Sequence, residues 1–133
     1  MRSRRFSAGA VAVVLALAAC GGRPSPDDPG LHSVAQAGTT GAEVVFDATV
    51  LADPQQVGDH EHIEVRAATG ETLEIDHNLS LAAWAPVHAG DRVVIAGQFY
   101  DDSGLEGVHC THAHTSSGCP YPGFIEFRGQ YYE

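Results

Sequence analysis

Short runs of alternating apolar and polar residues dominate the second half of the chain and predict β-strands. Residues 62–66 (His-Ile-Glu-Val-Arg) and 72–76 (Thr-Leu-Glu-Ile-Asp) alternate with period two, which is typical of strands with one buried face. The Thr69-Gly70 pair between them is a hairpin signal. Apolar, β-branched runs predict further strands at residues 43–51, 92–100, 107–112 and 124–132, the last with a turn at Gly129.

The segment between the third and fourth predicted strands breaks this alternation. Residues 80–84 (Ser-Leu-Ala-Ala-Trp) predict one or two helical turns, ended by Pro86. Three strands, a short helix and two more strands is the order of an oligonucleotide/oligosaccharide-binding (OB) barrel. Gly97 fits the fourth strand, because a glycine lets a barrel strand bend. We therefore predict an all-β fold, a small OB-like antiparallel barrel with one short helix. The alternative is another small antiparallel barrel or sandwich.

The first 19 residues predict an export signal rather than part of the fold. Arg2, Arg4 and Arg5 precede an apolar run over residues 8–19, which is shorter than the roughly 20 residues that a bilayer core requires. Cys20 follows Leu-Ala-Ala, a sequence that resembles the lipobox of bacterial lipoproteins. We expect Cys20 to be acylated, and the mature protein to be anchored in the cell envelope, outside the cytoplasm. The alternative is a plain secreted protein with a chance cysteine.

The composition changes after Cys20. Residues 21–41 are rich in Gly, Pro, Ser and Thr and poor in apolar side chains, which predicts a flexible tether. The predicted division is a signal peptide at 1–19, the lipidated cysteine and tether at 20–41, and one barrel domain at 42–133. A domain of this size buries only about 60–65% of its unfolded surface, which leaves no room for a second domain.

The charge argues against a nucleic-acid partner. The chain has 7 basic and 17 acidic residues, and three of the basic ones, with none of the acids, lie in the signal. The mature protein therefore keeps 4 basic (7 − 3) against 17 acidic residues, a formal net charge of −13. Such a charge repels phosphate backbones but is compatible with binding cations.

Two further cysteines, Cys110 and Cys119, lie in the barrel domain. An exported chain meets an oxidising environment, so we predict a disulfide between them. Closing this short loop contributes about 2.5–3 kcal/mol on a chain-entropy estimate. The alternative is that Cys110 is a thiolate ligand of a metal ion.

Histidine is abundant, with 8 residues in the chain. We expect His32, in the tether, and His88, beside a turn, to be exposed and without a role. In an OB barrel the first, third and fifth strands run one way and the other two run back, so His60, His77 and His112 gather at one pole. Imidazole is a common ligand of Zn²⁺ and Cu²⁺.

We therefore predict that this histidine-rich pole binds a metal ion, zinc or copper, or a small ligand. Asp59, Glu61 or Asp76 would add an oxygen ligand or orient a histidine. The alternative is a structural or interaction module of the cell envelope whose histidines only hold loops. The sequence contains no nucleophile elbow and no phosphate loop, so we do not predict an enzyme. Metal-assisted hydrolysis at the same pole is a third hypothesis. The candidate ligands are His60, His77, His109 and His112, and the supporting residues are Asn78, Thr111, His62 and His114.

Two motifs carry a resemblance to a known family. Residues 75–82 (Ile-Asp-His-Asn-Leu-Ser-Leu-Ala) and 107–112 (Gly-Val-His-Cys-Thr-His) resemble those of an uncharacterised family of small exported bacterial proteins, domain of unknown function 3465. The resemblance extends over most of residues 60–132 and implies an exported one-domain protein without an assigned activity. This chain departs from the family at Cys110, where a Trp is usual, and at Ala113-His114, where an Asp is usual. The motif positions that the resemblance implies are His60, His77, Asn78, His109, Thr111 and His112.

Overall fold

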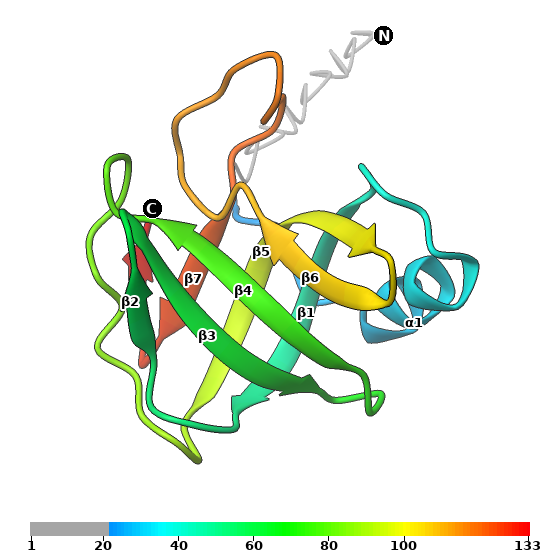
Figure 1. Ribbon diagram of the computed structural model, residues 1–133, viewed down its shortest axis with the longest axis horizontal. Helices are drawn as coiled ribbons and strands as arrows, with labels where there is room; N and C mark the ends of the chain where they lie inside the picture. The colour runs from blue at the N-terminus through cyan, green and yellow to red at the C-terminus, as the bar shows by residue number, and fades with distance from the viewer. Residues whose placement is uncertain (1–21) are drawn as a thin grey trace, which may run out of the picture.

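The computed structural model describes residues 22–133, which form a β-barrel with one helix against it (Figure 1). The predicted signal peptide and Cys20 lie outside the described residues. Within residues 22–133, no helix is both long enough and apolar enough to cross a bilayer. The elements are α1 (Asp28–Ala37), β1 (Glu43–Val50), β2 (Gln55–Val57), β3 (His60–Ala67), β4 (Thr72–Asn78), β5 (Arg92–Asp102), β6 (Leu105–His109), β7 (Phe124–Phe127) and β8 (Gln130–Tyr132).

Five strands close the barrel in the order β1-β3-β4-β6-β5, and β5 pairs back onto β1. Every pair is antiparallel except β4 and β6, which run parallel. This is the pairing expected for the first, second, third, fifth and fourth strands of an OB barrel. The predicted small all-β barrel is confirmed. The short strand β2 pairs with β3 and was not predicted, and β7 and β8 form a hairpin that continues the sheet from β5.

The barrel core follows the alternation seen in the sequence. Inward residues such as Ile63, Val65, Leu73 and Ile75 are fully buried, and their neighbours along β3 and β4 face outward. Gly97 allows β5 to lie close to the backbone of β6, since a Cβ at this position would lie 2.3 Å from the His109 carbonyl oxygen. The alternation of apolar and polar residues thus determines which side chains lie on the outer face of β3 and β4.

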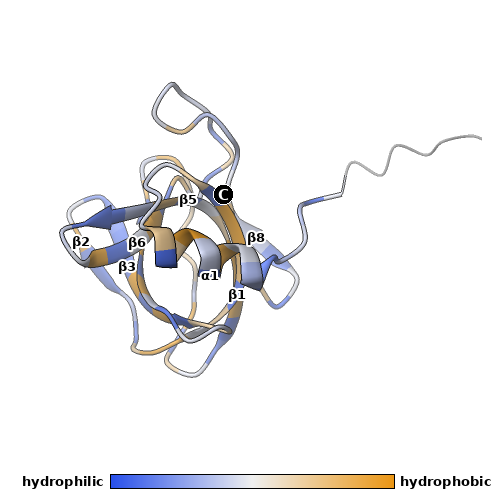
Figure 2. Cartoon of the chain, turned by 90° about the vertical axis from the view of Figure 1, so that its right-hand side faces the viewer, coloured by the Kyte–Doolittle hydropathy of each residue, from blue (hydrophilic) through white to orange (hydrophobic). Residues whose placement is uncertain are grey.

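The predicted flexible tether is wrong for residues 28–37, which form α1. Asp27 caps the helix by accepting a hydrogen bond from the Gly30 amide, and Gly38 ends it in the left-handed conformation. Leu31 and Ala35 are buried against the barrel core. Figure 2 shows α1 lying across one end of the ring of strands, so the folded domain begins well before residue 42.

The short helix predicted at residues 80–84 is also wrong. The Asn78 carbonyl accepts hydrogen bonds from the amides of Leu81 and Ala82, at 3.1 and 3.0 Å, and the chain then continues without helix. Ala85 and Val87 are buried in the barrel core, which requires an extended path here. The β4–β5 connection therefore packs on the side of the barrel away from α1 (Figure 1).

Candidate functional site

Three polar side chains meet on the outer face of β3 and β4. His62 is directly opposite Asp76 in the antiparallel pair, and Glu74 lies two residues away on the same face. His62 Nδ1 is 3.4 Å from Glu74 Oε1, and His62 Nε2 is 3.3 Å from Asp76 Oδ1. One ligand atom from each residue lies within 4.8 Å of the others. We call these three residues the acid–histidine cluster; its donor types suit a divalent transition metal.

Asp76 is the most constrained member of the acid–histidine cluster. Its Oδ2 accepts a hydrogen bond from the Tyr100 hydroxyl at 2.6 Å. Its Oδ1 is buried and accepts no hydrogen bond from the described residues, although His62 Nε2 lies 3.3 Å away. A buried carboxylate oxygen without a partner is unfavourable, and a bound cation would satisfy it.

Tyr100 reaches Asp76 from β5 by crossing β6. Gly107 of β6 pairs with both Glu74 and Tyr100, so it lies directly beneath this crossing. A Cβ on Gly107 would lie 2.3 Å from the Tyr100 hydroxyl oxygen, so only glycine fits. Burial, followed by the hydrogen bond and charge of Asp76, raises the pKa of Tyr100, which keeps the hydroxyl protonated as a donor.

The surroundings of the cluster favour positive charge. Burial is the main cause that raises the pKa of Glu74. The nearby carboxylate of Asp76 raises it further, because two negative charges close together repel each other. The cluster opens into a depression of about 390 Å³, whose rim includes His60 and His109. His109 Nε2 is hydrogen-bonded to Gln98 Oε1 at 3.1 Å, and burial lowers the pKa of its imidazole. A cation in the cluster would relieve the repulsion between the two carboxylates. One side of that cation would remain accessible from the depression.

His77 does not reach this face. Adjacent residues of a strand point to opposite sides, so Asp76 faces outward while His77 is fully buried inside. Its Nδ1 accepts from the Thr111 hydroxyl at 2.8 Å, and its Nε2 donates to the Ala83 carbonyl at 2.9 Å. Burial foremost lowers the pKa of His77, so the ring is neutral at pH 7. Both nitrogens are in use, and the geometry corrects the prediction that His77 is a metal ligand.

The other predicted residues divide in the same way. His112 is buried, with Nδ1 2.8 Å from the His114 carbonyl oxygen, while His60 lies on the outer face with Nδ1 2.9 Å from Asp59 Oδ1. Asn78 Oδ1 accepts from the Ser80 amide and holds the turn after β4. The strands do bring the histidines to one region, but the pleat separates an outer set from a buried set. The predicted single group of four histidine ligands is therefore wrong.

Glu61, which we expected to assist a metal, lies inside the barrel opposite His77. Its Oε2 accepts from the Ala85 amide at 2.8 Å, and its Oε1 is buried without a partner among residues 22–133. Burial raises the pKa of Glu61 to about 7. Glu61 and His77 together hold residues 83–85 of the β4–β5 connection.

The predicted disulfide is confirmed. Cys110 and Cys119 are bonded, with 5.5 Å between their Cα atoms. The bond leaves Cys110 no free thiolate, so the alternative role of Cys110 as a metal ligand is excluded in this state. The bridge holds the loop that follows β6, which includes Tyr121.

Comparisons with known proteins add no relative. No known protein family matches the chain, and no curated protein is significantly similar to it.

Proposed function

We propose that the chain is an exported lipoprotein whose barrel binds a divalent transition-metal ion, zinc or copper, through His62, Glu74 and Asp76. The observation that carries this proposal is the convergence of one imidazole nitrogen and two carboxylate oxygens within 4.8 Å. A mixed nitrogen and oxygen set suits zinc or copper, whereas calcium and magnesium prefer oxygen ligands alone.

The open side of the cluster supports a binding role. Three protein ligands leave a coordination position free, and the depression of about 390 Å³ lies beside it. Water or a small anionic ligand would complete the metal there. The strand-2 and strand-3 face of an OB barrel is also the face on which such folds bind ligands, and β3 and β4 occupy these places.

The export part of the proposal rests on the N-terminal sequence and on the disulfide. The basic and apolar N-terminus followed by Leu-Ala-Ala-Cys20 fits a lipoprotein signal, and a bond between Cys110 and Cys119 fits an oxidising compartment. Acylation of Cys20 would hold the mature chain to a membrane. The resemblance to domain of unknown function 3465 agrees with an exported protein and stays a prediction.

Calorimetric titration of zinc and copper into the mature chain, purified without a histidine tag, tests the metal site. We expect binding at micromolar or lower Kd, and a loss of at least tenfold in affinity for His62→Ala and for Asp76→Asn. His88→Ala is the matched control, because His88 is exposed and lies outside the cluster. Failure of the unchanged chain to bind either metal below millimolar concentration would end this proposal.

A structural role is the second candidate, and His77 favours it. Both of its ring nitrogens are bonded to protein, so this histidine stabilises a loop and binds nothing. If the whole histidine group is structural, the chain is an interaction or structural module of the cell envelope. In that case His62→Ala would leave metal titrations as flat as those of the unchanged chain.

A further inference from the structure

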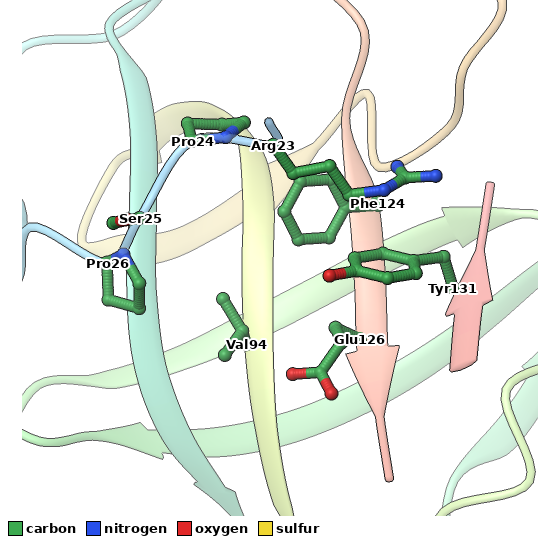
Figure 3. A pocket seen from close by; sticks show the side chains of 8 residues that line it. All are labelled: Arg23, Pro24, Ser25, Pro26, Val94, Phe124, Glu126 and Tyr131. Atoms are coloured by element: carbon green, nitrogen blue, oxygen red, sulfur yellow. The ribbon is translucent and has the colours of Figure 1, made fainter. Parts of the chain in front are cut away.

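The mature N-terminal segment is fixed to the barrel from Arg23 onward. The Arg23 guanidinium forms a two-point ion pair with the carboxylate of Glu133, with 2.7 Å between Arg23 Nη2 and Glu133 Oε1. The same guanidinium lies 3.7 Å from the centroid of the Tyr131 ring and 5.4 Å from that of Phe124. Figure 3 shows Arg23 extending beside Phe124 and Tyr131. Residue 23 is therefore attached to the last strands of the chain.

The residues after Arg23 continue along the barrel. The Asp27 amide donates to the Val45 carbonyl at 2.7 Å, and the Asp47 amide donates to the Asp28 carboxylate at 2.8 Å. Pro24 and Pro26 restrict the backbone between these contacts. The segment then enters α1, whose Leu31 is buried in the core. Residues 23–37 thus form part of the folded domain and leave little tether.

This attachment limits how far the barrel can stand from a lipid on Cys20. Only Gly21 and Gly22 separate Cys20 from Arg23. Three residue steps span at most about 11 Å when fully extended, at 3.3–3.6 Å per residue. A lipid on Cys20 would therefore hold the Arg23 region close to the headgroups.

Exposed tyrosines lie in this region. Tyr121, two residues after Cys119, is 61% exposed and shares an apolar groove with Pro24 and Pro122. Tyr131, beneath Arg23, is 42% exposed. Tyrosine is enriched where proteins meet the membrane–water interface, because its ring is apolar and its hydroxyl is polar. The bond between Cys110 and Cys119 restricts the chain two residues before Tyr121.

Resting on the proposed acylation of Cys20, we propose that the barrel lies directly on the membrane, with Arg23, Tyr121 and Tyr131 facing the phospholipid headgroups. In the closed strand order, β4, which carries Glu74 and Asp76, lies across the barrel from the β1–β5 pair, and Figure 1 shows β4 on the opposite side from β5 and β7. The acid–histidine cluster therefore faces away from the lipid. The contact depends on the short anchor, since Glu43 and Glu126 near this face repel anionic headgroups.

Quenching by brominated lipid tests this orientation. The lipidated mature chain is placed in phosphatidylcholine vesicles that contain brominated phosphatidylcholine. The double variant Trp84→Phe, Tyr121→Trp carries one indole in the proposed contact face, whereas the unchanged chain carries its one tryptophan in the β4–β5 connection. We expect at least threefold stronger quenching in the double variant. Equal quenching in the two proteins would overturn the orientation.

A longer anchor provides the matched control. Inserting ten Gly and Ser residues between Gly22 and Arg23 adds a root-mean-square span of about 17 Å. We expect quenching of the double variant to fall to the level of the unchanged chain, and undiminished quenching would contradict a contact set by the short anchor. Mass spectrometry of the Cys20 peptide separates the two proposals. An unacylated chain contradicts the lipoprotein proposal, whereas an acylated chain without quenching contradicts the orientation alone.

Discussion

Glu61 and His77 show how buried polar residues act on this barrel. They face each other across β3 and β4, and each binds one backbone group of the β4–β5 connection. Burial shifts the two groups in opposite directions: it raises the pKa of Glu61 to about 7 and lowers the pKa of His77. Both shifts favour the neutral form, as expected for side chains removed from water.

Replacing Glu61 with glutamine should remove a pH dependence of stability. The pKa of Glu61 is about 7 in the folded chain, whereas an unfolded carboxyl loses its proton near the ordinary pKa of 4.5. The contribution of the protonated group is therefore complete below about pH 4.5 and is lost as the pH rises to about 7. We expect Glu61→Gln to raise the free energy of unfolding by about 1–3 kcal/mol at pH 8 and to change it little at pH 4.5.

Urea unfolding of the two proteins at both pH values measures this effect. Glu64→Gln on the same strand is the control, because Glu64 faces solvent and its replacement should change stability by less than about 0.5 kcal/mol at either pH. A Glu61→Gln variant that is less stable than the unchanged chain at pH 8 would show that the carboxylate stabilises the loop in its ionised form.

Sequence reasoning located the candidate site only to a region. Strand direction predicts that His60, His77 and His112 lie together, but His77 and His112 are buried, whereas His60 lies on the outer face. The residue pattern gives His62 and Asp76 only a supporting role, because they become neighbours only through the pairing of β3 with β4. The pairing register of β3 and β4 can be predicted from the alternating residues of the two strands and from the Thr69-Gly70 turn between them. The hydrogen bond from Tyr100 to Asp76 is not predictable from the strand pattern, because it depends on β6 lying between β4 and β5.

At the scale of whole elements, the strands were predictable and the helix was not. Residues 43–50, 72–78 and 92–102 match apolar patterns that specify strands locally. The α1 segment has Pro29 and Gly30 in its first turn and Gly38 at its end, so its composition resembles a linker although these residues serve as helix boundaries. A ten-residue helix is marginal alone, and its packing on the barrel stabilises it.

Truncating Leu31 tests whether α1 belongs to the folded domain. Leu31 is 1% exposed and packs in the core, so Leu31→Ala should lower the free energy of unfolding by about 2–4 kcal/mol. Gln36→Ala on the exposed side of the same helix should change it by less than about 0.5 kcal/mol. Urea unfolding followed by circular dichroism measures both. Equal stability of the two variants would return residues 28–37 to the tether.

At the scale of the molecule, the closed barrel separates two faces. The Arg23 region lies over β5, β7 and β8, and the acid–histidine cluster lies on β3 and β4 across the barrel. Residues 20–133 hold 4 basic and 17 acidic residues, a formal charge of −13, which surrounds the cluster with a field that attracts cations. An anchored chain with this arrangement would present its metal site to the compartment and keep its aromatic face on the lipid.

Metal binding at the cluster should stabilise the barrel as a whole. His62 comes from β3, and Glu74 and Asp76 come from β4, so their ligand atoms converge only when the strands are paired in register. A metal at a hundred times its Kd adds about 2.7 kcal/mol to the folded state if the unfolded chain binds none. For a domain of about 100 residues this raises Tm by roughly 10–20 °C. Differential scanning calorimetry with and without zinc should show this rise in the unchanged chain and in His88→Ala, and should show no rise in His62→Ala. A rise that survives His62→Ala would mean that the stabilising metal binds elsewhere on the protein.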